Sequence, residues 1–221
     1  MRRAAIPAKG RSMDNPEPNA EGTRRSRGVQ TQRRVLDAAF RLVSRDGINA
    51  VTMIGIAREA GVAEKTVYNI FGSKTNLAAK LVELYQTTVI AEFGLSNFPD
   101  MDELFASIRA IAMDLARNRN WSQTIATLYF SDDVDPETYA RLQEVGLRHL
   151  QAALALAAHS HVVSDPRRLA IARHQFANLG YALVHDLASG RMDGRDLGDH
   201  LCFGLEATLS QLLGEEWKAS R

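Results

Sequence analysis

The segment from Thr52 to Leu77 constrains the fold more than any other stretch of this chain, because it places an Ala-Gly-Val turn between two short helical patterns. Thr52 can cap the first helix, since its hydroxyl group accepts a hydrogen bond from an unpaired backbone N–H. Gly61 can end that helix, because glycine adopts a left-handed conformation without a Cβ penalty. The second helix is predicted over Ala63–Ile70. A short helix held across another can enter the major groove of DNA, so the segment predicts a helix-turn-helix.

The second of these helices has an inward and an outward side. Val67 and Ile70 are three residues apart and can face the protein core. A cation, a hydroxyl, a phenol and an amide are then left to face outward, from Lys65, Thr66, Tyr68 and Asn69. Such groups bond phosphates and base edges. A solvated polar face is the alternative, but an outward tyrosine on so short a helix is harder to explain in that way.

A third helix is predicted to begin at Lys74, directly after Ser73, whose hydroxyl group can cap it. The free N–H groups at a helix N-terminus attract phosphate. A lysine in the first turn opposes the helix dipole. Contact with a phosphate explains the position of Lys74 better than a tolerated surface lysine does.

These residues resemble those of the TetR (tetracycline-repressor) family of bacterial regulators over about Val29–Leu81. The matching positions are Val35, Leu36, Asp37, Ala38, Ala39, Phe40, Gly47, Thr52, Ile56, Ala57, Ala60, Gly61, Val62, Val67, Tyr68, Phe71, Lys74 and Leu77. A bare helix-turn-helix is a weak pattern, whereas this many matched positions in order are a strong one.

The resemblance implies phosphate contacts from Thr52, Tyr68, Asn69 and Lys74, and base contacts from Glu64, Lys65 and Thr66. Two interpretations of Glu64 stay open, because a carboxylate accepts from a cytosine amine and also suits a helix N-terminus. Two positions depart from the family pattern. Ala63 stands where a capping Ser or Thr often precedes the recognition helix, and Asn76 stands where many members have Glu, so no capping box forms with Ser73.

Charge is divided unevenly along the chain. Residues 1–80 carry 15 Lys and Arg against 7 Asp and Glu, a net charge of +8, whereas residues 81–221 carry 12 against 19, a net charge of −7. A basic N-terminal part suits a polyanion. The single cysteine, Cys202, allows no intrachain disulfide and lies in an apolar helical pattern. We therefore expect a buried thiol rather than a redox sensor, in a cytoplasmic protein without a membrane span.

Residues 1–27 are rich in Arg, Pro and Ser and predict a disordered basic tail. The arginines just before the first helix can reach into a minor groove, as basic arms do: Arg24, Arg25 and Arg27. A simple soluble leader is the equal alternative. The helix-turn-helix domain is expected over residues 28–75, and a C-terminal effector-binding and dimerisation domain over residues 76–221.

The remaining pattern is helical throughout. Apolar residues at helical spacing, Asp before Pro at helix starts and glycine after helix ends define the elements. Beyond the turn, helices are expected at residues 29–45, 74–93, 100–117, 121–130, 136–158, 166–189 and 196–213. No segment shows the sustained alternation of a strand. The predicted fold is all-α, with about nine helices in a three-helix N-terminal domain and a larger C-terminal domain.

The last two predicted helices have broad apolar faces that must be buried. The faces hold Leu169, Ala172, Phe176, Leu179, Leu183 and Leu187 in one helix, and Leu201, Leu205, Leu209 and Leu212 in the other. They form either the core or a four-helix interface with a second copy. The family resemblance favours the interface, and a two-fold dimer reads two half-sites about 34–36 Å apart, or a multiple of that. We therefore expect a homodimer on double-stranded DNA.

Members of the TetR family usually bind a small molecule in the larger domain. Residues that suit an aromatic pocket with a few polar groups are Phe105, Met113, Trp121, Tyr129, Phe130, His174, Tyr181 and His185. Filling a core is the alternative for any one of them. Neither a metal nor a cofactor is expected, because the histidines lack further ligands at metal-binding spacing.

The sequence does not predict an enzyme, since it lacks a glycine-rich phosphate loop, a nucleophile elbow and a metal set. It predicts a sequence-specific transcriptional regulator, namely a repressor that a small hydrophobic or aromatic effector releases from a palindromic operator. An effector-independent activator or architectural DNA-binding protein is the alternative.

Overall fold

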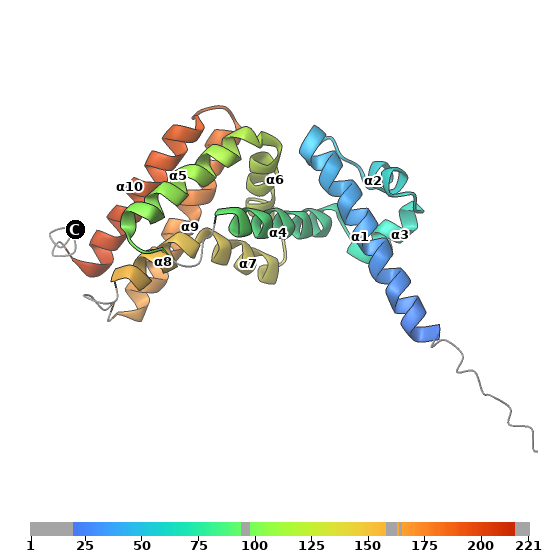
Figure 1. Cartoon of the computed structure of the whole chain (residues 1–221), viewed down its shortest axis with the longest axis horizontal. Helices are drawn as coiled ribbons and strands as arrows, with labels where there is room; N and C mark the ends of the chain where they lie inside the picture. Colours follow the sequence, from blue (N-terminus) through green and yellow to red (C-terminus); the bar gives the residue numbers. More distant parts are fainter. Residues whose placement is uncertain (1–19, 94–97, 158–162, 164, 215–221) are drawn as a thin grey trace, which may run out of the picture.

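A computed structural model of the chain describes residues 20–93, 98–157, 163 and 165–214. Ten α-helices and no strand occur among these residues, so the predicted all-α fold is confirmed (Figure 1). None of the described helices is long and apolar enough to cross a lipid bilayer. Residues 1–19, which the sequence assigns to a disordered tail, lie outside the described residues.

The N-terminal part consists of three helices: α1 (Ala20–Asp46), α2 (Met53–Ala60) and α3 (Glu64–Phe71). They pack around one end of a large apolar core. Val35, Ile56 and Val67, one from each helix, are fully buried in it. This packing holds α3 across α2 in the arrangement that the turn predicts.

Helix α1 begins at Ala20, well before its predicted start at Val29. The prediction of a disordered tail is therefore wrong for the last residues of that segment. The three arginines for which a minor-groove arm and a simple leader were the equal alternatives lie in a helix: Arg24, Arg25 and Arg27. The last proline before α1 is Pro18, and extending a helix that is already anchored adds one hydrogen bond for each residue fixed.

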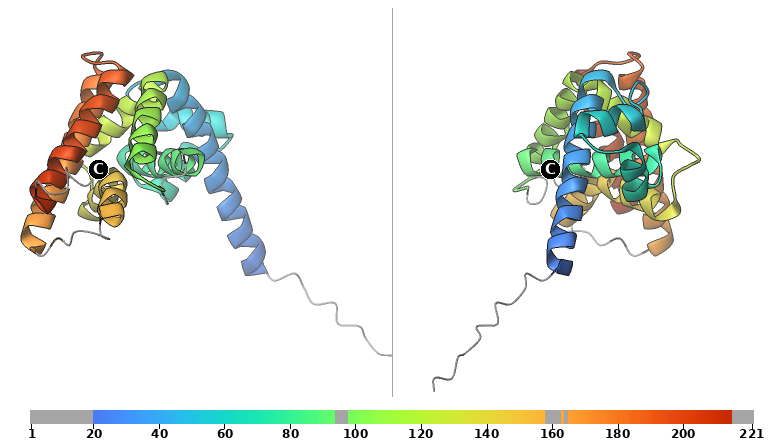
Figure 2. Two further views of the ribbon diagram at one scale, coloured as in Figure 1. Left: turned by 60° about the vertical axis from the view of Figure 1, so that its left-hand side comes forward. Right: turned by 90° about the vertical axis from the view of Figure 1, so that its right-hand side faces the viewer.

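The larger part contains six further helices: α5 (Met101–Arg117), α6 (Arg119–Tyr129), α7 (Pro136–Gly146), α8 (Arg148–Ala157), α9 (Pro166–Ala188) and α10 (Gly194–Leu213). Helix α10 packs along α5 and α9, on the side of the molecule remote from α1–α3 (Figure 2). The aspartates at the predicted helix starts cap α5, α7 and α9 through their side chains: Asp100, Asp135 and Asp165. Cys202 on α10 is buried, as predicted.

The segment predicted as one helix over residues 136–158 is two helices separated at Leu147, so that prediction is wrong. Gly146 lies against the ring of Tyr181, where a Cβ atom would come within 3.1 Å of Cε2. The Tyr181 hydroxyl donates to the Leu142 carbonyl, in the last turn of α7, at 2.5 Å. Glycine is a poor helix former. The Tyr181 hydroxyl also competes with the helix backbone N–H groups for the Leu142 carbonyl, so the helix is interrupted here.

Helix α4 (Lys74–Phe93) joins the two parts and lies between them in Figure 1. The helical spacing of Leu77, Leu81 and Leu84 predicts that all three face inward. Leu77 and Leu81 are fully buried, but the prediction is wrong for Leu84, which is 39% exposed because the buried stripe passes through Tyr85 instead. Buried residues form one continuous cluster from α1–α3 through α4 to α6 and α9. Helix α4 therefore packs against both parts of the chain.

Candidate nucleic-acid interface and interior cavity

The turn between α2 and α3 has the geometry that its residues predict. The Thr52 hydroxyl accepts a hydrogen bond from the Gly55 N–H at 3.0 Å and caps α2. Gly61 is left-handed, with φ of 64° and ψ of 42°, and its N–H bonds back to the last turn of α2. The Val62 N–H donates to the Ala57 carbonyl at 3.0 Å. These bonds satisfy carbonyls at the end of α2 and set the direction of α3.

Helix α3 has one buried and one exposed side. Val67 and Phe71 are buried and Ile70 is partly buried. The other side carries the polar residues of the helix, which are exposed except for the partly exposed Thr66: Glu64, Lys65, Thr66, Tyr68 and Asn69. The Tyr68 side chain is 45% exposed although the same helix has a buried face. Helix α3 thus displays to solvent the polar groups that the sequence assigns to DNA.

The junction between α3 and α4 follows the predicted caps. The Ser73 hydroxyl accepts from the Asn76 N–H at 3.1 Å and caps α4. Lys74 is partly exposed in the first turn of that helix. The N-terminus of α3 has no side-chain cap, because Ala63 offers no hydrogen-bonding group. Lys74 and the first-turn N–H groups of α4 follow α3 directly in the chain, and free N–H groups at a helix N-terminus suit an anion.

A cavity of about 140 Å³ lies in the larger part of the chain, against the C-terminal half of α4. Its walls are mostly apolar and include Ile108, Leu115, Ile125, Phe176, Val184 and Leu201. Helix α4 contributes Tyr85 and Gln86, and the α7–α8 region contributes Gly146 and His149. None of the described residues that line it is an aspartate, glutamate, lysine or arginine. Apolar walls with a few polar groups are typical of small-molecule sites.

Comparison with known proteins identifies the family that shares these features. The family model for bacterial regulatory proteins of the tetR family matches residues 35–81. An uncharacterized HTH-type transcriptional regulator of Mycobacterium bovis is 30% identical over 144 residues, which are 64% of this chain and 75% of the relative. A regulator of the same description from Mycobacterium tuberculosis matches to the same extent. The chain belongs to the TetR family. It is a DNA-binding transcriptional regulator.

Solved TetR structures share this fold. A TetR transcriptional regulator from Rhodococcus sp. RHA1 has a TM-score of 0.62 at 18% identity, over 83% of this chain and 98% of that one. FadR of Bacillus subtilis, in complex with stearoyl-CoA, has a TM-score of 0.59 at 18% identity, over 81% and 98%. SmeT, the repressor of the Stenotrophomonas maltophilia efflux pump SmeDEF, has 0.54 at 19%, over 83% and 90%. At these identities the likeness establishes the fold.

Of the residues predicted for a TetR-type ligand pocket, only Tyr181 lines this cavity. The others lie outside it: Met113, Phe130, His174 and His185 in exposed positions, and Phe105, Trp121 and Tyr129 in the packed core. The predicted set therefore does not correspond to the cavity. Those residues suit a pocket by type, but residue type does not say which side of a helix meets a cavity.

Tyr129 holds a polar network beside the cavity. Its ring stacks on that of Tyr181, with centroids 3.8 Å apart. Its hydroxyl donates to Asn178 Oδ1 at 2.5 Å and accepts from the Tyr139 hydroxyl at 3.2 Å. Burial raises the pKa of Tyr129 to about 12, so the phenol is neutral at pH 7. The network fixes Tyr181 and with it one wall of the cavity.

Three polar residues of the cavity wall were not predicted as pocket residues: Tyr85, Gln86 and His149. The Tyr85 hydroxyl donates to Asp114 Oδ2 at 2.7 Å, and burial raises the pKa of Tyr85 well above its usual range. Part of His149 is accessible, but its Nε2 atom is buried without a hydrogen-bond partner among the described residues. Burial lowers the pKa of His149 to about 4. Apolar residues lie on several sides of α8, so their spacing does not predict that His149 lines a cavity.

Proposed function

We propose that this TetR-family regulator is a repressor that binds a palindromic operator as a homodimer and leaves it when a small hydrophobic effector fills the cavity. The position of α4 carries the proposal. Lys74 lies in its first turn beside α3, and Tyr85, Gln86 and Val89 line the cavity farther along the same helix. A ligand that prefers one position of α4 must therefore change the DNA-binding part as well.

The proposed DNA contacts lie on the outward side of α3 and on the caps beside it. Phosphate contacts come from Thr52, Tyr68, Asn69 and Lys74, and base contacts come from Glu64, Lys65 and Thr66. The Thr52 oxygen accepts from the Gly55 N–H, which leaves the hydroxyl proton for a phosphate. The proposed base-reading residues occupy the first turn of α3, and the N-terminal residues of a recognition helix contact base edges.

The proposed dimer forms through α9 and α10. Their outer sides keep large apolar residues in solvent, since Phe203 is 72% exposed, Ile171 49% and Leu179 37%. Their inner sides belong to the core, where Phe176 and Leu205 are buried. A second copy packed on the outer sides would remove this apolar surface from water and would place two recognition helices for two half-sites. A monomeric mass at micromolar concentration would contradict the dimer.

A stack of aromatic rings connects the cavity to α1. Tyr85 lines the cavity and stacks on Trp121, with centroids 4.8 Å apart and planes inclined by 7°. The Trp121 ring lies 4.6 Å from that of Phe40 on α1, and its Nε1 donates to the Ser44 hydroxyl at 3.0 Å. Asn120 donates to two carbonyls at the end of α1. Packed cores do not deform continuously, so a ligand that shifts Tyr85 also shifts the surface on which α1 rests.

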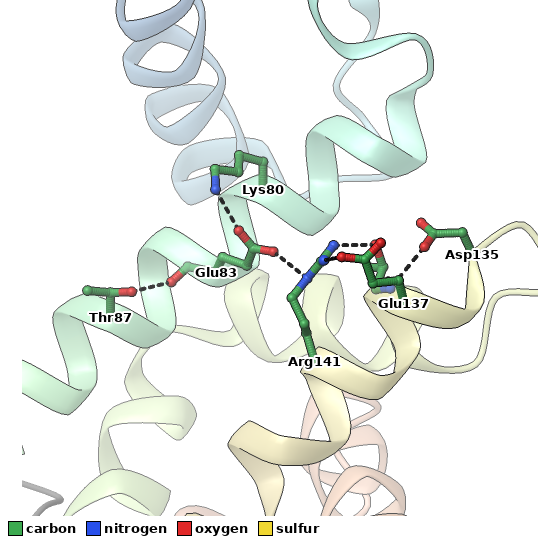
Figure 3. A network of polar contacts seen from close by, with 7 residues as sticks. Lys80, Glu83, Thr87, Asp135, Glu137 and Arg141 are labelled. Carbon is green, nitrogen blue, oxygen red and sulfur yellow. Dashed lines mark hydrogen bonds and ion pairs between the residues drawn. The ribbon is translucent and has the colours of Figure 1, made fainter.

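An ion-pair network connects α4 to α7 (Figure 3). Arg141 Nε on α7 lies 3.1 Å from Glu83 Oε1 on α4, and Lys80 Nζ lies 2.7 Å from Glu83 Oε2. Arg141 also pairs with Glu137 at 2.7 Å. Helix α7 ends at Gly146, which lines the cavity. Movement of the cavity wall on α7 is thereby transmitted to the helix that holds the DNA-binding part.

Two proteins of the same fold support repression and ligand control as the functions to test. SmeT is a repressor of an efflux pump, and FadR was solved with stearoyl-CoA bound. The cavity against α4 gives this chain the physical means for the same kind of control.

The first test is selection of bound sequences by the full chain from a random DNA pool at fixed salt. We expect a palindromic motif whose half-sites lie about 34–36 Å apart, or a multiple of that. Operator affinity is then measured by fluorescence anisotropy with and without a ligand that binds the cavity, and we expect the ligand to lower it. Enrichment of no motif would contradict a specific regulator. A tightly bound cavity ligand that left operator affinity unchanged would contradict the coupling.

A further inference from the structure

The cavity suits a ligand without charge. Its described lining has no charged side chain, and its walls are mostly apolar. An ionised group moved into such surroundings loses its hydration and finds no countercharge. The volume of about 140 Å³ is close to the roughly 150 Å³ of an apolar protein cavity that takes up benzene. The space therefore fits a molecule with about one aromatic ring.

The polar groups of the wall differ in what they can offer such a ligand. The Tyr85 hydroxyl already donates to Asp114 at 2.7 Å, and the Tyr181 hydroxyl donates to the Leu142 carbonyl at 2.5 Å. The Gln86 side chain acts on the same Tyr181 hydroxyl and partly offsets the effect of burial, which raises the pKa of Tyr181. The His149 Nε2 atom is buried without a partner among the described residues. A buried polar atom in this state costs free energy. His149 lines the cavity, so a small shift of its ring would bring Nε2 to a ligand, and a hydrogen bond there would restore that free energy.

The protonation state of His149 narrows the ligand chemistry further. Burial lowers the pKa of His149 to about 4, so the imidazole is neutral at pH 7. A neutral imidazole has one nitrogen that donates and one that accepts, and the tautomer decides which is Nε2. A carbonyl oxygen of a ligand can accept a hydrogen bond from Nε2 only in the tautomer in which Nε2 carries the proton. A hydroxyl group can donate or accept, so it can form a hydrogen bond with Nε2 in either tautomer.

We propose that the ligand of this cavity is a small uncharged molecule, of monocyclic aromatic size, whose hydroxyl group hydrogen-bonds Nε2 of His149. This assignment rests on the proposed function in that the cavity is taken as the effector site. The apolar walls bury the ring, and His149 selects for the hydroxyl group. Molecules of the same shape that lack the hydroxyl bind more weakly, and charged analogues are rejected.

The test is isothermal titration of the full chain at pH 7 with four probes of similar size: benzyl alcohol, toluene, benzoate and benzylammonium. We expect saturable binding of benzyl alcohol at one site per chain, and affinity for toluene about tenfold lower. We expect no measurable binding of the two ions. Equal affinity for toluene and benzyl alcohol, tighter binding of an ion, or no binding of benzyl alcohol would each overturn the assignment.

Substitution of His149 tests the residue itself. With His149→Leu, benzyl alcohol should bind no better than toluene, while the affinity for toluene changes less than about twofold, since the leucine keeps the wall apolar. His149→Gln keeps a hydrogen-bonding group and should retain part of the preference. His185→Leu is the matched control, because His185 is exposed and does not line the cavity. A His149→Leu protein that still preferred benzyl alcohol would overturn the role of His149.

Operator binding, measured in the same samples, distinguishes this assignment from the proposed function. If benzyl alcohol binds as expected but leaves operator affinity unchanged, the effector mechanism fails and the ligand class stands. If a charged compound releases the operator and benzyl alcohol does not bind, the ligand class fails and the effector mechanism stands.

Discussion

The outward side of α3 and the cavity beside α4 hold their polar groups in opposite environments. On α3, the charged and polar side chains of Lys65, Tyr68 and Asn69 are exposed to solvent. At the cavity wall, a nitrogen of the neutral His149 imidazole is buried, and the other lining residues are mostly apolar. Contacts between exposed charges weaken as salt screens them, whereas a buried neutral hydrogen bond does not depend on salt in this way. One helix, α4, contributes to both regions, so the two proposed binding reactions, with DNA and with an effector, should respond differently to salt and pH.

The largest effect is expected from deleting the Trp121 ring, which connects the cavity wall to α1 of the helix-turn-helix part. Trp121 is 3% exposed and packs between Phe40 of α1 and Tyr85 of α4. Trp121→Ala should lower the free energy of unfolding by about 3–5 kcal/mol, the usual cost of deleting a buried tryptophan side chain. Urea unfolding followed by circular dichroism, at equal protomer concentrations, measures the difference.

Phe130→Ala is the control for Trp121→Ala, because Phe130 follows the same helix but is 55% exposed. It should cost less than about 1 kcal/mol. If Trp121→Ala proved as mild as this control, the two regions would not depend on the aromatic stack.

The next largest effect is the loss of stability at acid pH that the low pKa of His149 causes. The pKa of His149 is lowered by burial from 6.5 to about 4 in the folded chain. Between these values the unfolded chain binds more protons, so stability falls as pH decreases from about 6.5 to about 4. His149→Leu should remove on the order of 3 kcal/mol of this acid destabilisation, because 1.36 kcal/mol corresponds to one pKa unit. Urea unfolding at pH 7, 5.5 and 4 measures it.

His185→Leu provides the reference for the acid effect, since it removes an exposed histidine. Parallel stability curves for His149→Leu and the wild type between pH 7 and pH 4 would mean that His149 is not held neutral. At pH 7 itself, His149→Leu should be at least as stable as the wild type, because it replaces a buried unpartnered polar atom with an apolar group.

The helix-turn-helix region could be predicted from the sequence because its structure depends on local interactions. The cap at Thr52, the left-handed Gly61 and the buried Val67 each depend on neighbours within one or two helical turns. The bounds of α4, Lys74–Phe93, were likewise predicted as the structure has them, because Ser73 marks its start. The roles of the exposed residues toward DNA remain predictions.

The cavity could not be predicted, because it is a meeting of several helices far apart in the sequence. Spacing shows that residues share a helix side, but it does not show which neighbour that side meets. Spacing along α4 therefore predicts an inward Leu84, whereas Tyr85 is buried and Leu84 is exposed. Gly146 was a usable signal for the break between α7 and α8, but only its contact with Tyr181 explains why the helix ends there.

Substitution of two lysines, one on α3 and one on α4, distinguishes base recognition from phosphate contact in the proposed DNA interface. Lys65→Ala should reduce discrimination between the preferred base and its alternatives by about 1–3 kcal/mol at one position. Lys74→Ala should weaken all sequences alike and reduce the slope of log affinity against log salt by about 0.9 for each phosphate that the lysine no longer neutralises. Anisotropy titrations against operator variants at several salt concentrations measure both.

The two lysine variants serve as controls for each other, since both remove one cation. An unaltered base preference in Lys65→Ala would refute base reading by Lys65. A salt slope that did not change in Lys74→Ala would refute its phosphate contact.

The smallest effect on stability should come from the ion pair between Glu83 and Arg141, although this pair joins α4 to the cavity wall. The two side chains are 31% and 49% exposed, and such pairs contribute less than about 1 kcal/mol to folding. Glu83→Gln should therefore leave the unfolding midpoint nearly unchanged. It should nevertheless reduce the loss of operator affinity that a cavity ligand produces, because the ion pair that links α7 to α4 is then weaker.

Arg173→Gln is the matched control for this coupling. Arg173 pairs with Glu144 of α7 at 2.6 Å but belongs to α9, so its ion pair does not reach α4. Operator affinity is measured for each variant without ligand and with saturating benzyl alcohol, and the ratio gives the coupling. The ratio should fall toward one in Glu83→Gln and stay at the wild-type value in Arg173→Gln. If both variants changed it equally, a general loss of surface charge, rather than the link between α4 and α7, would explain the response.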